Sequence, residues 1–67
     1  MKYFTGFVFG LFNGEKSLSS YDSIFFGPCE SKDAFDEHMK KEFYKEFDGT
    51  DFLSVTAESM EVMEIKQ

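Results

Sequence analysis

Apolar residues fill both alternating sets of positions in residues 2–12 (KYFTGFVFGLF). The odd set is Tyr3, Thr5, Phe7, Phe9 and Leu11, and the even set is Phe4, Gly6, Val8, Gly10 and Phe12. Aromatic and β-branched residues favour a strand, and a strand with no polar side normally lies at the centre of a sheet. Two interpretations stay open. The strand is an ordinary central strand with a helix over one face, or its second face is exposed and meets a partner or a second copy.

Asn13-Gly14 follows this strand and is a strong hairpin-turn signal, which Glu15, Lys16 and Ser17 could extend into a longer loop. A second strand is predicted over roughly residues 18–26. We expect it to end at Gly27-Pro28, because proline cannot donate a hydrogen bond to a sheet.

Residues 31–48 carry the clearest helical pattern. Ser31 is a good N-cap, and Asp33 lies in the first turn, where the helix dipole favours a negative charge. An apolar stripe then recurs every fourth residue and predicts one buried side. The stripe is Phe35, Met39, Phe43 and Phe47. Gly49 is expected to close the helix in the left-handed C′ position.

Residues 51–66 predict a third strand, in which apolar Leu53, Val55 and Ala57 alternate with polar residues. Past Ser59 the apolar residues change parity, and a bulge or turn near Glu58-Ser59 would explain the change. A terminal helix over residues 57–66 is an alternative, because Ala, Glu and Met are good helix formers.

The predicted fold class is therefore α+β, with the order ββαβ in a single domain covering residues 1–67. The hairpin and a helical crossover to the third strand give a sheet of order 2-1-3, with antiparallel pairing and three or, with a split last strand, four strands. One amphipathic helix packs on one face of the sheet. Gly6 and Gly10 would let that helix approach closely.

Composition restricts how so short a chain is stabilised. A domain of this size buries only about 60% of its unfolded surface, so it needs tight packing, a crosslink, a metal or self-association. The single cysteine excludes an internal disulfide, and the single histidine excludes multi-histidine metal sites. Ten phenylalanines remain as the main resource, and they are numerous for so small an interior.

The formal net charge is −6, with thirteen acidic residues, seven lysines and no arginine. Nucleic-acid binding needs cations against phosphates, so direct contact with nucleic acid is not expected. An acidic surface instead suits docking onto a basic surface of another protein. The apolar start of the chain is too short to span a membrane and is interrupted by glycine, so we expect a cytoplasmic protein without a targeting segment or membrane contact.

No residue pattern predicts catalysis, a cofactor or a metal. Cys29 and His38 lie nine positions apart with no third group to orient them, so a structural thiol and a boundary histidine are expected rather than a nucleophile and base. The carboxylates are expected to be a solvated face or, in the functional interpretation, a row of anions aimed at a basic target. The residues predicted to bind a partner are Asp33, Asp36, Glu37, Tyr21, Glu58, Glu61 and Glu64.

The chain opens with a hairpin-like segment that runs from Met1-Lys2-Tyr3-Phe4 to Phe12-Asn13-Gly14. In this opening and in size, charge and element order, it resembles small acidic proteins that bacteriophages encode against host defence, such as anti-CRISPR proteins and phage antitoxins. The resemblance implies a non-enzymatic inhibitor in the host cytoplasm that occludes the nucleic-acid site of a host protein. The alternative is a homo-oligomeric structural or accessory module without inhibitory activity, in which two copies pair uncovered sheet faces or edges.

Overall fold

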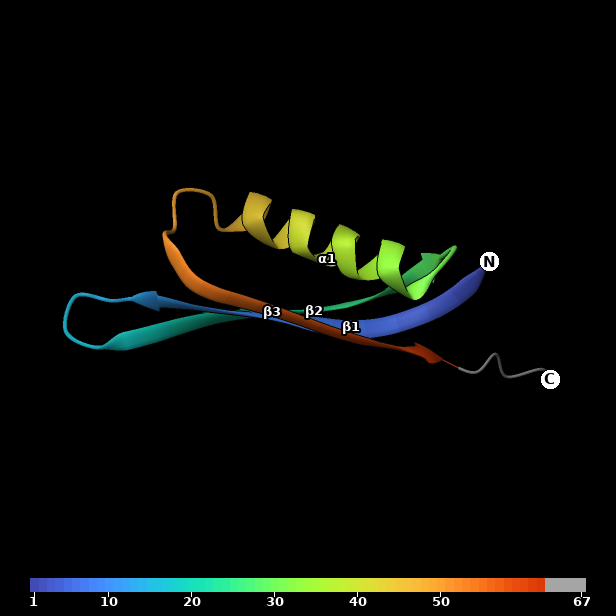
Figure 1. The fold of residues 1–67 in the computed structure, drawn as a ribbon, viewed down its shortest axis with the longest axis horizontal. Coiled ribbons are helices and arrows are strands. Elements are labelled where there is room, and N and C mark those ends of the chain that lie inside the picture. The colour runs from blue at the N-terminus through green and yellow to red at the C-terminus, as the bar shows by residue number, and fades with distance from the viewer. Residues whose placement is uncertain (63–67) are drawn as a thin grey trace.

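The computed structural model describes residues 1–62, which form one helix packed on one side of a three-stranded sheet (Figure 1). Along the chain the elements are β1 (Lys2–Asn13), β2 (Leu18–Cys29), α1 (Lys32–Glu46) and β3 (Phe52–Val62). Both outer strands pair antiparallel with β1, and the sheet order is β2-β1-β3. The predicted α+β class, the 2-1-3 order and the single helix on one face are confirmed.

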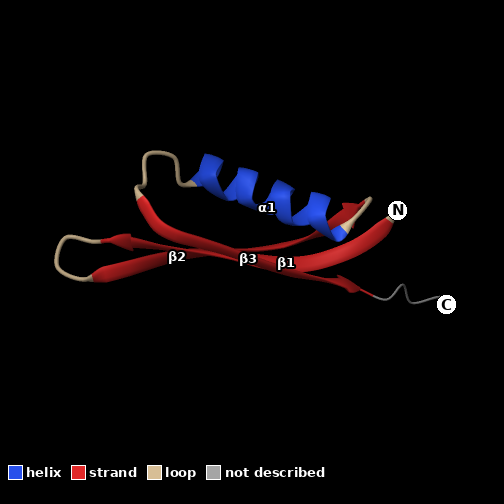
Figure 2. Ribbon diagram, viewed as in Figure 1, coloured by secondary structure: helices blue, strands red, loops and turns tan. Residues whose placement is uncertain are grey.

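The register fixes which side chains share a face. Within β1 the even positions point toward α1, and the odd positions point away from it. Gly6 pairs with Phe25 on β2 and with Ser59 on β3, so these residues share the helix side of the sheet. Phe7 pairs with Ile24 and Glu58, which therefore lie on the side away from the helix. Figure 2 shows that the single helix lies on one side of the three strands and that no described element lies on the other side.

The core lies between α1 and the even face of β1. Its fully buried members are Phe4 and Val8 of the sheet and Phe35, Met39 and Phe43 of the helix. Phe4 stacks on Phe35 with ring centroids 5.4 Å apart. The predicted helical stripe therefore supplies most of this core. Fully burying one such side chain stabilises the fold by about 1.5–3 kcal/mol.

Two glycines of β1 let the helix and the neighbouring strand come this close. A Cβ added to Gly6 would lie 2.9 Å from the Met39 sulfur, and one added to Gly10 would lie 2.9 Å from the Phe43 ring and 2.6 Å from the Phe52 ring. Real Cβ atoms essentially never approach other atoms closer than 3.0 Å. The expectation that Gly6 and Gly10 permit close packing is confirmed.

The helix termini follow the sequence signals with one shift. The Ser31 hydroxyl accepts a hydrogen bond from the Ala34 N–H at 3.2 Å, which confirms the N-cap. At the other end the C-cap is Phe47, and Gly49 has the positive φ of 87° two residues later. It occupies the third position of a turn closed by the Thr50 N–H on the Phe47 carbonyl, where a positive φ is required.

The hairpin and β2 differ from the simplest expectations. The loop contains four residues, 14–17, closed by a hydrogen bond from the Gly14 N–H to the Ser17 carbonyl, so the extended loop forms rather than a two-residue Asn-Gly turn. The predicted stop at Gly27-Pro28 is wrong, since β2 continues to Cys29. An edge strand tolerates proline because alternate N–H groups point away from the sheet.

The third strand corrects two further expectations. Residues 57–62 are strand, so the alternative terminal helix is wrong over this range, and its remaining residues lie outside the described part of the chain. No bulge occurs at Glu58-Ser59, because the pairing with β1 is continuous from Ser54 to Val62. The irregularity lies at Leu53 instead. The change of apolar parity past Ser59 therefore places Met60 and Val62 on the side away from α1.

Candidate functional site

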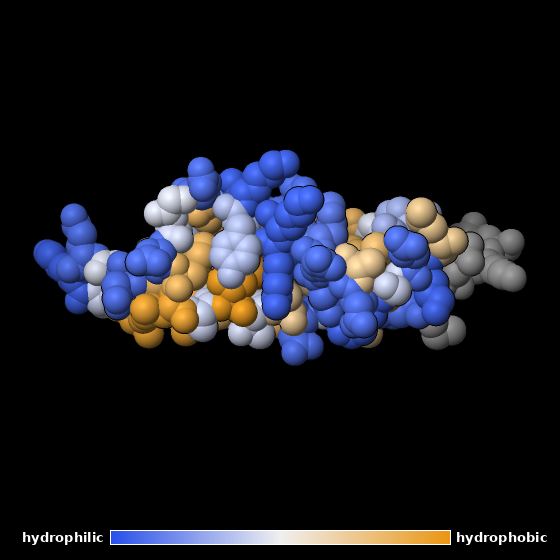
Figure 3. Space-filling view, turned by 45° about the horizontal axis from the view of Figure 1, so that its top comes forward, coloured by the Kyte–Doolittle hydropathy of each residue, from blue (hydrophilic) through white to orange (hydrophobic). Residues whose placement is uncertain are grey.

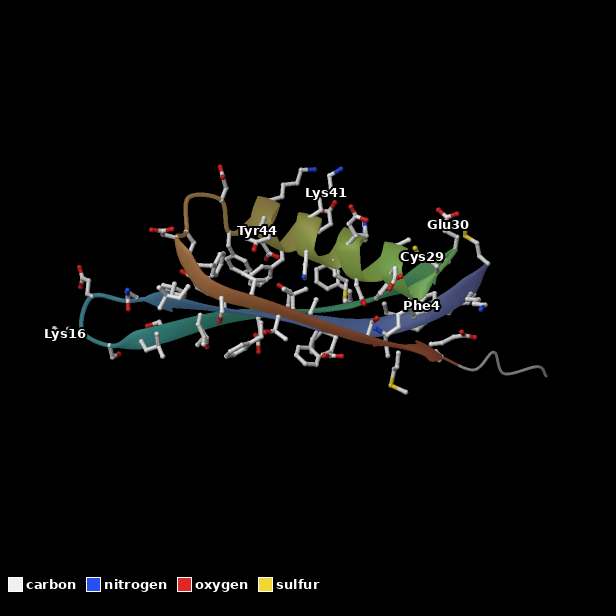
Figure 4. All side chains as sticks on the ribbon, in the orientation of Figure 1. Phe4, Lys16, Cys29, Glu30, Lys41 and Tyr44 are labelled. Atoms are coloured by element: carbon white, nitrogen blue, oxygen red, sulfur yellow. The ribbon has the colours of Figure 1, made fainter. Side chains whose placement is uncertain are left out.

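The side of the sheet opposite α1 is the most unusual surface of the described chain. We call it the open face and define it by its large apolar side chains, which come from all three strands. These are Tyr3, Phe7 and Phe9 of β1, Ile24 and Phe26 of β2, and Met60 of β3. Figure 4 shows side chains projecting from the strands on this side with no described element beyond them, whereas Phe4 projects toward the helix.

These side chains are exposed to a degree that is unusual for their size. Ile24 is 85% exposed and Phe26 is 68% exposed, while the rings of the central strand are 36–44% exposed. At about 200 Å² for a fully exposed large side chain, the six exposed fractions amount to roughly 680 Å² of mainly apolar surface. The largest apolar patch on an ordinary monomer covers about 300–600 Å². The open face therefore exceeds an ordinary surface patch and approaches the size of one partner's share of a standard interface, about 800 Å².

A shallow groove of about 510 Å³ runs across the middle of the open face. Its lining residues are Thr5, Gly6, Phe7, Phe9, Asp22, Ile24, Glu58, Ser59 and Met60. Phe7 and Phe9 form its apolar centre on β1. Asp22 lies beside Phe9 on one edge strand, and Glu58 lies beside Phe7 on the other. The groove therefore has an apolar centre with one carboxylate on each side.

No lysine belongs to the open face in the described part of the chain. Lys2 is the one lysine within the described strands, and it lies opposite Cys29 on the helix side. Neither Asp22 nor Glu58 takes part in an ion pair among residues 1–62, where the ion pairs are Lys2–Glu61 and Lys32–Asp36. Both carboxylates are consequently available to cations from another molecule.

Two of the predicted helical binding residues, Asp33 and Glu37, are exposed on α1. The outer surface of the helix is mainly hydrophilic, as the view toward that side shows (Figure 3). It also carries cations, since Lys40, Lys41 and Lys45 are exposed on the same helix. The exposed surface of α1 is therefore mixed in charge and is not a uniform row of anions.

Asp36 occupies a different environment from the other two helical carboxylates. It accepts hydrogen bonds from the Ser59 hydroxyl of β3 and from the Lys32 ammonium group, the latter at 3.0 Å. Partial burial raises the pKa of the Asp36 carboxyl, but the hydrogen bonds from Ser59 and Lys32 outweigh it, so the pKa is lowered overall. The hydrogen bond to Asp36 likewise raises the pKa of Lys32. The Asp36 carboxylate thus joins α1 to β3, and reversing its charge would disturb the fold.

Tyr21, predicted to bind a partner from an edge strand, does lie on the edge strand β2. Its ring points to the helix side, where it stacks on Phe47 at 4.3 Å and on Phe12 at 4.5 Å between ring centroids. It also meets the edge of Phe52. Tyr21 therefore packs the end of the helix against the sheet, and its position alone accounts for a large aromatic residue.

Of the three glutamates predicted as a C-terminal row, Glu58 and Glu61 are described by the structure, and they lie on opposite faces of β3. Glu58 lies on the open face, whereas Glu61 lies opposite Phe4 on the helix side and forms an exposed ion pair with Lys2 at 3.7 Å. Glu64 lies outside the described residues. Among the predicted binding residues that lie within residues 1–62, only Glu58 lines the apolar groove.

The two residues considered for nucleophilic chemistry lie on separate elements of the described structure. Cys29 is a partly buried free thiol at the end of β2, and His38 is exposed on α1. Within residues 1–62, no three His, Cys, Asp or Glu side chains lie close enough to hold a metal ion. The described helix is also too short and too polar to cross a membrane.

Sequence reasoning raised the possibility of an exposed second face but did not select its residues. It placed the binding site on carboxylates and Tyr21, and it omitted Phe26, Ile24 and Asp22. One signal could have identified the face. Gly6 and Gly10 share the even parity of β1, so the helix must approach on that side and leave Phe7 and Phe9 on the other.

The fold and this surface define a small acidic α+β protein with one sheet face uncovered by its own described chain. Comparison with known proteins adds no name to that description, since no family model, curated protein or solved structure gave a significant match.

Proposed function

We propose that this chain is a protein-binding module that docks its open face onto a partner protein. The observation that carries the proposal is the apolar area of that face, which is roughly the share of one partner in a standard interface. Aromatic residues and methionine are enriched at such interfaces. Burying them against another protein would also give a small domain the additional apolar contact that its own single helix does not provide.

The acidic charge favours a basic partner. A chain with a net charge of −6 is attracted to positively charged surfaces, which raises the rate of association at low salt. Proteins that handle nucleic acids present such surfaces. Docking there would occlude the nucleic-acid site, so we propose that the chain is an inhibitor of the kind that bacteriophages use against host defence.

Capture of partners with two matched variants tests the docking face. Ile24→Thr/Met60→Thr removes two exposed apolar side chains from the open face, and threonine preserves the strand preference. Lys40→Ser/Tyr44→Ser alters exposed residues of α1 and serves as the control. We expect the unmodified protein and the helix variant to capture the same partner from a native lysate, and the open-face variant to lose it while keeping its far-UV circular dichroism spectrum. Equal capture by the open-face variant would contradict the proposal.

A binding assay on the captured partner tests the inhibitory part. The unmodified chain is expected to reduce the partner's affinity for nucleic acid, and the open-face variant is expected to leave that affinity unchanged. If the chain binds but nucleic-acid affinity is unaffected, docking stands and occlusion does not.

A homo-oligomeric module is the second candidate, because the same apolar face would also be covered by a second copy. One feature disfavours face-to-face pairing. Within residues 1–62, each copy would bring Asp22 and Glu58 and no lysine to the interface, so four carboxylates would meet without a cation from the described part of either chain, and unpaired charges are costly to desolvate. Light scattering across a concentration range distinguishes the two candidates, since only self-association makes the mass rise with concentration.

A further inference from the structure

The arrangement of the open face also indicates what kind of surface it accepts, if the proposed docking function holds. Its centre is the pair of rings Phe7 and Phe9, and its margins are the two edge strands. Adjacent strands are about 4.8 Å apart, so the outer strands are separated by about 9.6 Å. An α-helix with its side chains is about 10–12 Å wide. One helix therefore spans the sheet from β2 to β3.

The opposite face of the same sheet already shows how a helix fits. There α1 lies along the strands, with its apolar stripe against β1 and with the neighbouring strands on both sides. A second helix on the open face would complete a three-layer arrangement, with the sheet between two helices. Layers of this kind bury both faces of an apolar central strand, which is the usual environment of such a strand.

The two carboxylates at the margins of the groove favour an amphipathic helix that carries positive charge on both sides of its apolar stripe. Asp22 borders the groove on β2 and Glu58 borders it on β3, offset by one two-residue step along the strands. From the strand spacing and rise, these two positions are about 12 Å apart across the groove. Lysine and arginine side chains have long apolar stems that pass over apolar surface and place the charge at its margin. Cations on both sides of an apolar stripe would therefore reach both carboxylates.

A second copy of the chain fits this surface less well. Its described residues supply no cation to the open face and add two further carboxylates, and its own net charge of −6 opposes the approach. The same carboxylates repel nucleic acid, and no lysine among residues 1–62 lies on this face to neutralise phosphate.

We propose that the open face receives an amphipathic helix of the partner protein, with its apolar stripe over Phe7 and Phe9 and with lysine or arginine on both flanks opposite Asp22 and Glu58. This inference rests on the proposed docking function and specifies the chemistry of the partner. It is tested with a defined probe, so that its outcome is separate from partner capture.

The probe is a synthetic peptide of about 18 residues, or about 27 Å of helix, with leucine on one stripe and lysine elsewhere. A control peptide has glutamate in place of lysine, and a second control scrambles the leucine and lysine order. Fluorescence anisotropy gives the dissociation constants. We expect the lysine peptide to bind, and the glutamate and scrambled peptides to bind at least about tenfold more weakly, a change of about 1.4 kcal/mol.

Two variants with the same charge change separate position from net charge. Asp22→Asn/Glu58→Gln and Asp33→Asn/Glu37→Gln each replace two carboxylates by amides and change the formal net charge from −6 to −4. The open-face pair is expected to weaken binding about tenfold and to reduce its salt dependence. The helix pair is expected to change binding less than about twofold. Equal weakening by both pairs would overturn the proposal, since net charge alone would then explain the binding.

Methyl-labelled methionine locates the bound peptide by NMR. Met60 lies on the open face, and Met39 is fully buried under α1 and serves as an internal control. The Met60 methyl signal should shift on titration while the Met39 signal stays in place. An unmoved Met60 signal, or a dimer whose formation excludes the peptide, would overturn the proposal. If capture of a native partner still depends on the open face in that case, the docking function stands and only the helical, basic occupant is wrong.

Discussion

Replacing one buried aromatic residue of α1 and one exposed aromatic residue of the open face tests whether the structure assigns core and docking surface correctly. Phe43→Ala removes a fully buried ring of α1, and Phe26→Thr removes a ring of β2 that is 68% exposed. Alanine is the best helix former and threonine is a good strand former, so neither change introduces a large penalty from backbone preference. The comparison therefore reports mainly on packing.

The expected magnitudes differ several-fold. Phe43 packs against Phe47 and Phe52 with ring centroids 4.9 and 5.2 Å away, and truncating a buried phenylalanine costs about 3–5 kcal/mol. Phe26 buries only about a third of its ring and stacks on Tyr3 at 6.0 Å. Scaled from about 1.5–3 kcal/mol for full burial, its loss should cost about 0.5–1 kcal/mol.

Urea denaturation followed by circular dichroism measures both changes. A small domain without crosslinks is stable by only about 3–5 kcal/mol, so Phe43→Ala should be largely unfolded before urea is added. Phe43→Leu provides a milder replacement with a measurable transition, expected at a cost of about 1–2 kcal/mol. A loss of stability for Phe26→Thr equal to or larger than that for Phe43→Leu would refute the assignment of the two faces.

Three further changes probe the packing on the helix side. Gly10→Ala should destabilise the fold by about 1–3 kcal/mol in thermal unfolding, because the new methyl group would overlap the Phe52 ring; an unchanged melting temperature would contradict the close approach. Tyr21→Ala should lower the free energy of unfolding by about 2–4 kcal/mol, because it removes a ring that stacks on Phe12 and Phe47. A purely interfacial role of Tyr21 would instead leave the free energy of unfolding unchanged. Asp36→Asn should make the free energy of unfolding less sensitive to acid. The pKa of Asp36 is lowered in the folded state, so the ionised carboxylate stabilises the fold at pH values above its ordinary pKa of 3.8. This stabilisation is lost as the pH falls through the lowered pKa of the folded state. Urea titrations between about pH 5 and 2 check this, and parallel pH profiles for the variant and the unmodified protein would show that the bonds to Lys32 and Ser59 contribute nothing.

Much of the fold follows from local patterns in the sequence. The strand that is apolar on both faces takes the central position of the sheet, and Ser31 caps the N-terminus of the helix. The apolar residue at every fourth position of the helix identifies its buried side. These features can be predicted from the sequence because each depends on residues that are close in the chain and on a single physical preference. The two glycines of β1 add a long-range constraint, because their position on the same face of the strand is explained by a helix that packs closely on that face.

The remaining features depend on pairing between distant segments. Whether Pro28 ends a strand depends on whether that strand is an edge, and this is known only once the sheet order and register are fixed. The parity change past Ser59 looks like a bulge if all apolar residues are assumed to face one core. It is instead a continuous strand whose later apolar residues face the open side.

The residues of the open face cannot be selected from the sequence for the same reason. Charged residues are conspicuous in an acidic sequence, whereas Ile24, Phe26 and Met60 look like ordinary core residues until the register places them away from the helix. Asp36 shows the converse, because a carboxylate on a predicted solvated surface is engaged by Ser59 of a strand 23 positions away.

Site-specific photocrosslinking tests the central claim most directly. A benzophenone amino acid is introduced in place of Phe26 on the open face or in place of Tyr44 on α1, both of which are exposed aromatic residues. After irradiation in a native lysate, the account predicts a crosslinked product with a different protein at position 26 and little or none at position 44. Crosslinking at position 44 without crosslinking at position 26 would contradict a docking surface on the open face.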